Sequence, residues 1–285
     1  MRITSYALLL IVVCCCNSKN KSIDKKDTIV SKHEVLVPEF QKILDVAQVK
    51  GSILIYALED DIYYSNDYQW ARKEHLPAST FKIANSIIAL ETGVVADDST
   101  LFKWDGTKRS IKNWEQDLIL KDAFHFSCVP CYQEIARKIG LKRMTHHLDE
   151  LNYGSMKVDT TNIDLFWLEG ESRISQFQQI DFLKRFYRSE LPISERTDII
   201  IKRMMVIEKN DEYTLRGKTG WSTSNGIDNG WFVGYIELSN RPYFFATNLE
   251  PEQQFEMAKF ATIRKEITFM ALQQLNIGKK ELFQL

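Results

Sequence analysis

Residues 79–92 have the sequence STFKIANSIIALET, which is apolar on most faces of a helix. A segment of that kind is a buried helix, and Pro77 near its start and Gly93 at its end are typical helix boundaries. The i, i+3 spacing places the Ser79 hydroxyl and the Lys82 amine on one face, within reach of each other. A serine hydroxyl becomes a good nucleophile only beside a base. The segment therefore predicts a buried helix that begins with a nucleophile and a candidate base.

Helical and β-rich segments lie in blocks around this helix. The helical candidates are residues 39–46, 130–139, 141–152, 175–187, 194–208 and about 253–275, and the β-rich runs are 51–58, 62–65, 213–219, 230–238 and 243–249. Turn residues at 59–61, 228–230 and 239–242 separate the runs. Two early and three late strands around a helical middle predict an α+β fold. We expect an antiparallel sheet flanked by N- and C-terminal helices, with a mostly helical subdomain.

The N-terminal residues differ in composition from the rest of the chain. In residues 1–16, Arg2 precedes an apolar run and the three consecutive cysteines Cys14–Cys16, a pattern typical of an export signal. A cysteine after an aliphatic stretch resembles a lipoprotein signal, which would attach the protein to a membrane through an N-terminal lipid. A cleaved signal with incidental cysteines stays open, and both predict a periplasmic protein. Residues 17–35 predict a flexible tether and residues 36–285 one folded unit.

Composition excludes several classes of protein. The 285 residues carry a formal net charge of −1, which argues against a protein that binds nucleic acid by neutralising phosphates. No apolar run approaches the roughly 20 residues of a spanning helix. Cys128 and Cys131 form a C-x-x-C pair near His125, but a zinc site lacks a fourth ligand, so we expect no metal. A local disulfide and two buried thiols both stay open. The sequence does not predict an oligomeric state.

Two further motifs follow the first along the chain. Lys218-Thr219-Gly220 ends the β-rich run 213–219, where a cation and a hydroxyl can hold a carboxylate and glycine allows close approach to the backbone. Ser127-Cys128-Val129 precedes the helix expected at 130–139. The combination of S-x-x-K, S-D-N and K-T-G is typical of penicillin-recognising proteins. Here S-x-V stands where S-D-N is expected.

With that substitution the chain resembles the class D, oxacillinase-type serine β-lactamases, from the early strands to the C-terminal helix. The resemblance includes segments that carry no single chemical role: Tyr153-Gly154, 166–170, 173–175, 230–234 and 244–248. One departure is Ser155, because the family usually has Y-G-N there. The resemblance implies a β-lactamase/transpeptidase-like fold and hydrolysis of β-lactam antibiotics.

The resemblance also implies a catalytic role for individual residues. Ser79 would attack the β-lactam carbonyl and form an acyl-enzyme, and Ser127 would relay a proton to the lactam nitrogen. Lys82 would be N-carboxylated by CO2 to N6-carboxylysine, and its carbamate would act as the general base. Trp167 would donate a hydrogen bond to the carbamate, and Val129 would supply apolar surroundings. No cofactor other than this CO2 is implied.

A second group of residues would bind the substrate. Lys218, Thr219 and Arg264 would hold the substrate carboxylate, with Gly220 beside them. The backbone N–H groups of Trp221 and of the nucleophile would form the oxyanion hole. The partners implied are β-lactam small molecules.

Other activities of this superfamily make distinguishable predictions. Glu150-Leu151-Asn152 matches the end of a class A motif, but the position of the deacylating glutamate is Leu148, which cannot act as a base. A penicillin-sensing domain that acylates without turnover shares the three motifs. A peptidoglycan D,D-peptidase more often carries S-x-N than Ser127-x-Val129. Both stay alternatives to hydrolysis.

Overall fold

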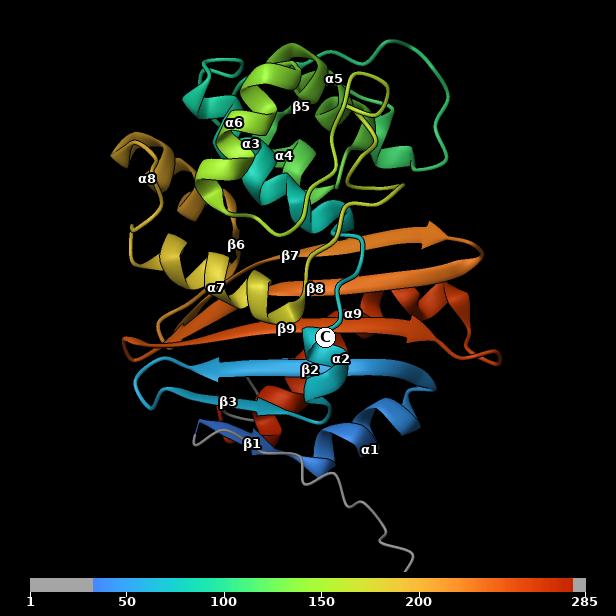
Figure 1. The fold of residues 1–285 in the computed structure, drawn as a ribbon, viewed down its shortest axis with the longest axis vertical. Helices are drawn as coiled ribbons and strands as arrows, with labels where there is room; N and C mark the ends of the chain where they lie inside the picture. Colours follow the sequence, from blue (N-terminus) through green and yellow to red (C-terminus); the bar gives the residue numbers. More distant parts are fainter. Residues whose placement is uncertain (1–32, 279–285) are drawn as a thin grey trace, which may run out of the picture. The chain divides into compact units, whose positions relative to one another are not determined.

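The computed structural model describes residues 33–278, which contain a seven-stranded sheet (Figure 1). The strands are β1 (Glu34–Leu36), β2 (Val49–Ala57), β3 (Ile62–Ser65), β6 (Val206–Lys209), β7 (Tyr213–Ser224), β8 (Ile227–Leu238) and β9 (Arg241–Pro251). Their order is β1-β3-β2-β9-β8-β7-β6, and all neighbours are antiparallel except β1 and β3. The expected antiparallel sheet is therefore present, with one parallel pair at its edge.

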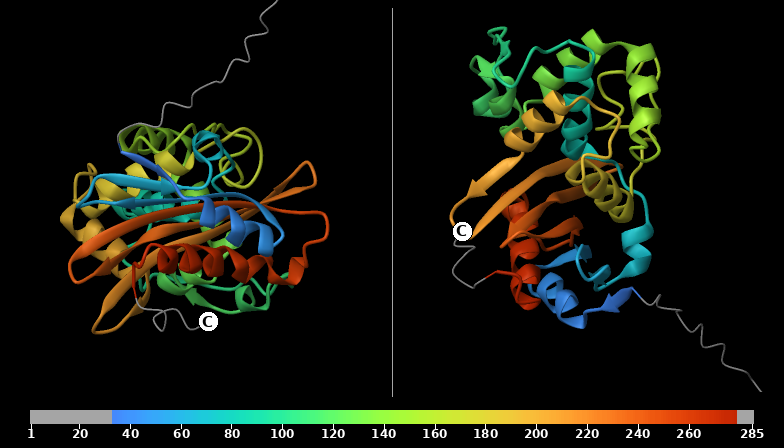
Figure 2. Two further views of the ribbon diagram at one scale, coloured as in Figure 1. Left: turned by 90° about the horizontal axis from the view of Figure 1, so that it is seen from below. Right: turned by 90° about the vertical axis from the view of Figure 1, so that its left-hand side faces the viewer.

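Both faces of the sheet are buried, which explains the unbroken apolar run in β2. Side chains alternate along a strand. Ile53 and Ile55 belong to one core cluster, together with α1 (Pro38–Val46) and α9 (Phe260–Gln274). Leu54 and Tyr56 belong to the other cluster, together with the remaining large helices. The views in Figure 2 show α1 and α9 together on one side of the sheet.

The second core cluster joins the sheet to the helical subdomain. Its elements are α2 (Tyr68–Arg72), the 3-10 turn η1 (Ala78–Phe81), α3 (Lys82–Glu91), α4 (Leu120–His125), α5 (Val129–Ile139), α6 (Leu141–Leu151), α7 (Gln176–Tyr187) and α8 (Glu195–Met204). Helices α3, α4, α5 and α6 gather on the β7 side of the sheet (Figure 1). A short pair, β4 (Leu101–Phe102) and β5 (Leu118–Ile119), and the turns η2 (Lys112–Trp114) and η3 (Met257–Lys259) complete the fold. Within residues 33–278 no helix has the length and apolarity to cross a membrane.

Several predicted boundaries were wrong. Residues 194–208 are not one helix, because α8 ends at Met204 and 206–209 form the edge strand β6 beside β7. Residues 228–230 are not a turn but part of β8, and the reversal lies at Asn225-Gly226, where both φ angles are positive. The last helix begins at Phe260, well after the expected start.

The N-terminal predictions lie almost entirely outside the described residues. The expected signal, residues 1–16 with Cys14–Cys16, is not described, and neither are residues 17–32 of the tether. Both stay predictions. The end of the expected tether was wrong, because Glu34 and Val35 belong to strand β1, which pairs with β3.

Candidate active site

The proposed nucleophile lies in the 3-10 turn η1, immediately before α3, rather than in the α-helix itself. Side chains at i and i+3 eclipse in a 3-10 turn, and the Lys82 amine donates a hydrogen bond to the Ser79 hydroxyl at 3.0 Å. The Lys82 side chain is fully buried, whereas Ser79 keeps 6% of its surface exposed. Burial lowers the pKa of the Lys82 amine to about 7, because desolvation penalises the charged form. The pair is thus a hydroxyl at a cavity wall beside a readily deprotonated amine.

The backbone just before the nucleophile has an unusual conformation that neighbouring elements hold in place. Ala78 has φ +51°, in the left-handed region, and its N–H donates to the carbonyl of Trp167 at 2.8 Å. The carbonyl of Leu76 accepts hydrogen bonds from the Asn229 amide at 2.9 Å and the Trp231 indole at 2.8 Å, both on β8. Strained residues persist where the surroundings fix them, and they cluster at functional sites. These contacts fix the path of the chain into Ser79.

Strand β7 carries a second buried lysine, Lys218, which contacts a second serine hydroxyl. The Lys218 amine is buried and donates to the Ser127 hydroxyl at 2.5 Å and to the Thr219 carbonyl at 3.0 Å. Burial, together with the nearby charges of Lys82 and Arg264, lowers the pKa of Lys218 well below its usual value. Ser127 and Lys218 therefore form a hydrogen-bonded pair between the α4–α5 turn and the sheet.

Gly220 has a structural role beside the one that the sequence predicted. A Cβ at this position would lie 3.2 Å from the Pro77 carbonyl oxygen and 3.2 Å from the Thr80 nitrogen. The missing side chain therefore lets β7 approach the nucleophile turn η1, and Gly220 also lines the cavity described below. The motif also lies in the middle of β7 and not at its end, because the strand continues to Ser224.

Arg264 is a buried cation whose hydrogen bonds go to backbone carbonyls and whose guanidinium also lies 5.7 Å from the ring centres of Trp221 and Phe260. From α9 its guanidinium donates to the carbonyls of Phe260 at 2.8 Å, Gly220 at 2.5 Å and Ala261 at 2.9 Å. Burial lowers its pKa to about 10, so it stays charged at neutral pH. No carboxylate within residues 33–278 forms an ion pair with it. Its charge is therefore available to an anionic ligand.

These groups meet in a cavity of about 540 Å³ between the helical subdomain and β7. Of the predicted site residues, its lining includes Ser79, Ser127, Val129, Lys218, Thr219, Gly220, Trp221 and Arg264. No aspartate or glutamate is among the described residues of this lining, whereas His125 and Lys265 add two further basic side chains. The cavity is thus built to accept a negatively charged ligand.

Trp167 lies behind this cavity, not on its wall. Its ring is fully buried and stacks on Phe81, with 5.4 Å between the ring centroids. The indole Nε1 is buried and has no hydrogen-bond partner in the described part of the chain. An indole N–H usually finds a partner when it is buried, so this donor is available to an acceptor near α3.

Comparison with known proteins places most of the described chain in one family. Residues 38–268 match the penicillin-binding protein transpeptidase domain. The chain is 41% identical over 218 residues to β-lactamase OXA-48 of Klebsiella pneumoniae, covering 76% of this chain and 82% of that protein. It is 42% identical over 221 residues to β-lactamase OXA-10 of Pseudomonas aeruginosa, covering 76% and 83%. The class D β-lactamase of Sebaldella termitidis has a similar structure, with a TM-score of 0.83, 38% identity and 87% and 100% coverage. The chain belongs to the class D β-lactamases.

Several residues that line the cavity of this class D β-lactamase were not predicted from the sequence. The missed apolar residues are Ile111, Trp114, Phe124, Phe126 and Ile207, from η2, α4 and β6 and the segments beside them. Single apolar side chains of this kind form no motif, so only their placement in space identifies them. His125, considered above only as a metal ligand, also lines the cavity, and burial lowers its pKa.

The alternatives for the cysteine pair are resolved. Cys128 and Cys131 of this class D β-lactamase form a disulfide, so the alternative of two free thiols was wrong. Residues 33–278 contain no group of three or more side chains that could hold a metal ion. Leu148, at the position of the class A glutamate, is buried on α6 and does not line the cavity.

Proposed function

We propose that this protein hydrolyses β-lactam antibiotics, penicillins first, through an acyl-enzyme on Ser79. One observation carries the proposal: a serine hydroxyl lies 3.0 Å from a buried lysine amine, in a cavity whose ionisable lining residues are all basic. A penicillin carries one carboxylate beside its strained amide. The cavity offers a nucleophile for the amide and cations for the carboxylate.

The polar residues that line or adjoin the cavity have different roles in the proposed reaction. Ser79 Oγ attacks the lactam carbonyl while Lys82 takes up its proton, which contributes about 10²–10⁴-fold in rate. The backbone N–H groups of Ser79 and Trp221 stabilise the developing oxyanion, and each such donor contributes about 10²–10³-fold. The carbonyl–nitrogen bond then breaks, the Ser127 hydroxyl protonates the nitrogen, and the proton that Lys82 took from Ser79 passes through Lys218 to Ser127, which frees Lys82 to act again. Water then attacks the acyl carbonyl while Lys82 takes up its proton, and that proton passes to Ser79 Oγ as the acid leaves.

Binding of the substrate carboxylate falls to the cations beside the nucleophile. Lys218, Thr219 and Arg264 all line the cavity that Ser79 lines, and Gly220 beside them brings β7 against η1. Because Arg264 has no carboxylate partner in the described residues, the incoming anion completes its pairing. A hydrogen bond to a charged group contributes about 1.5–3 kcal/mol.

We also propose that Lys82 carries CO2 as N6-carboxylysine. Only a neutral amine adds CO2, and with a pKa of about 7 roughly half of the Lys82 amines are neutral at pH 7. The unpartnered Trp167 indole N–H is a donor that an anion on Lys82 would satisfy. When present, the carbamate supplies an anionic oxygen that can accept a proton beside Ser79. These two features support the modification.

The carbamate predicts a characteristic dependence on pH and bicarbonate. Below pH 7 the Lys82 amine gains a proton and cannot add CO2, so turnover in degassed buffer should fall as the pH drops from 8 to 6. Added bicarbonate should restore the rate severalfold, most strongly near pH 6.5. Steady-state rates of nitrocefin hydrolysis with and without bicarbonate measure this. A rate that bicarbonate leaves unchanged at every pH would contradict a carboxylated Lys82.

Turnover itself distinguishes hydrolysis from penicillin sensing. We expect nitrocefin colour to develop linearly until many equivalents per protein molecule have been consumed, because the base beside Ser79 serves both acylation and deacylation. Absorbance at a known protein concentration measures it. A burst of one equivalent followed by no further reaction would indicate a sensor. Cleavage of a D-alanyl-D-alanine peptide with no nitrocefin turnover would indicate a D,D-peptidase.

A further inference from the structure

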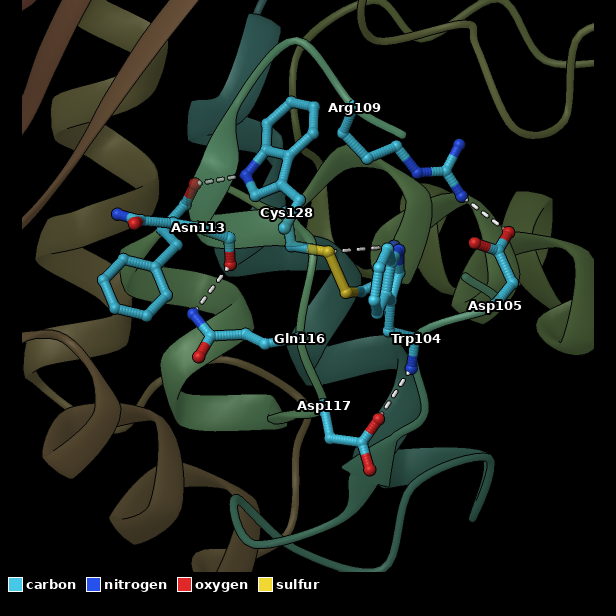
Figure 3. Close-up of a disulfide and its surroundings, with 10 residues drawn as sticks. Trp104, Asp105, Arg109, Asn113, Gln116, Asp117 and Cys128 are labelled. Carbon is cyan, nitrogen blue, oxygen red and sulfur yellow. Dashed lines mark hydrogen bonds and ion pairs between the residues drawn. A yellow bond between two sulfur atoms is a disulfide. The ribbon is translucent and has the colours of Figure 1, made fainter. Parts of the chain in front are cut away.

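The disulfide between Cys128 and Cys131 begins at the residue that follows Ser127 in the chain. Cys128 is the residue before α5, and its sulfur also accepts a hydrogen bond from the Cys131 N–H at 3.2 Å, which caps the helix. Both cysteines line a second cavity of about 320 Å³ together with Trp104, whose ring lies beside the disulfide (Figure 3). The flanking residues Ser127 and Val129 line the catalytic cavity, and Trp114 lines both. The disulfide thus belongs to the wall of a cavity that adjoins the catalytic one.

Ser127 has a backbone conformation that must be held from both sides. Its φ is +53°, in the left-handed region, which a non-glycine residue adopts only where its surroundings fix it. On the preceding side its N–H donates to the Phe124 carbonyl at 3.2 Å, and the Trp114 indole donates to the Phe126 carbonyl at 2.9 Å. On the following side the Cys128 N–H donates to a carbonyl of α4 at 2.8 Å. Within residues 33–278, the disulfide to α5 is the one covalent constraint on this turn besides the chain itself.

Helix α5 is in turn fixed to the helix that carries the catalytic lysine. The hydroxyls of Ser86 on α3 and Tyr132 on α5 form a hydrogen bond of 2.7 Å, and both side chains are buried. The Lys82 amine lies 4.9 Å from the centre of the Tyr132 ring. Tyr132 follows Cys131 in the chain. The disulfide therefore connects Cys128, the residue after Ser127, to the turn of α5 whose Tyr132 packs beside Lys82.

We propose that the Cys128–Cys131 disulfide is a positioning element for Ser127, which holds its hydroxyl in register with Lys218 and with the nucleophile. The proposal rests on the proposed function, because Ser127 acts there as the proton relay. Loss of the cross-link displaces this hydroxyl within the turn, and a displacement of about 1 Å can cost up to 10²-fold in rate. Loss of the cross-link therefore lowers the rate of acylation, in which the lactam nitrogen is protonated, and leaves the rate of deacylation unchanged.

Stopped-flow acylation by a fluorescent penicillin tests this in the full chain. Cys128→Ser and Cys131→Ser both remove the cross-link, and the first keeps a side chain that caps helices well. We expect acylation to slow about 10-fold or more in both variants, with the deacylation rate close to wild type. Leu44→Ala, on α1 in the other core cluster, serves as the control for lost stability. A lower amplitude with an unchanged rate constant, as expected for partial unfolding alone, would overturn the proposal.

A double-mutant cycle identifies the residue through which the disulfide acts. In a Ser127→Ala background, removing the cross-link should slow acylation no further, because the hydroxyl that it positions is already gone. An equal additional loss in that background would contradict positioning of Ser127. If the unmodified protein neither acylates nor turns over any β-lactam, the proposed function fails instead. The two failures are therefore distinguishable.

Discussion

The Ser79→Ala variant should show no covalent labelling by a fluorescent penicillin and a value of kcat/KM for nitrocefin about 10⁶-fold below wild type. Removing the nucleophile of a comparable serine hydrolase costs about that much. The variant should fold normally, because the hydroxyl makes one side-chain hydrogen bond, to Lys82. Gel fluorescence after labelling, with circular dichroism as the folding check, measures the outcome.

An exposed serine provides the control for this variant. Ser99→Ala, in the loop before β4, should leave both labelling and turnover at the wild-type level. Labelling of Ser79→Ala at the wild-type level would show that another hydroxyl is the nucleophile. Ser127 would then be the first to examine, because it lines the same cavity and contacts Lys218.

Replacing Lys82 with methionine should lower kcat/KM about 10³–10⁴-fold, the range that general base catalysis contributes. Methionine is unbranched and fills the buried site without an ionisable group. Because burying the amine lowers its pKa to about 7, folding is penalised by this lysine near neutral pH, and the variant should melt at an equal or higher temperature. Steady-state kinetics and a thermal melt measure the two effects separately.

Lost activity together with retained stability in Lys82→Met would distinguish a missing base from a misfolded protein. Lys142→Met, at an exposed position of α6, is the matched control and should change neither quantity. A Lys82→Met variant with wild-type turnover would show that the base lies elsewhere. A variant that loses activity only because it unfolds would melt at a lower temperature, contrary to the prediction.

Local patterns in the sequence predicted most of the elements that carry the proposed catalytic residues. The apolar run at 79–92 and the i, i+3 pair of Ser79 and Lys82 required only helical periodicity. The sequence could not predict that Ser79 lies in a 3-10 turn, because Phe81 and its neighbours fit either helix type. Asn229 has the local preference of a turn residue, but in the fold its amide bonds the Leu76 carbonyl and Asn248, so it lies in a strand.

The backbone geometry of the site could not be predicted from local sequence patterns, for a different reason. Positive φ angles are predicted at glycine, yet the two such residues nearest the chemistry are Ala78 and Ser127. Each is held by partners distant in sequence, such as the Trp167 carbonyl for Ala78. Tertiary contacts, not local preference, determine these conformations. The same holds for the unpartnered Trp167 indole, which the family resemblance singled out but periodicity did not.

Mass spectrometry of the protein during turnover shows directly whether Ser79 forms the acyl-enzyme. Wild-type protein mixed with excess benzylpenicillin and quenched in acid should show one penicilloyl adduct, located by proteolysis on the peptide that contains Ser79. After the substrate is exhausted, the same protein should return to its unmodified mass. An adduct on a different peptide, no adduct during hydrolysis, or an adduct that persists after the substrate is gone would contradict a serine β-lactamase acting through Ser79.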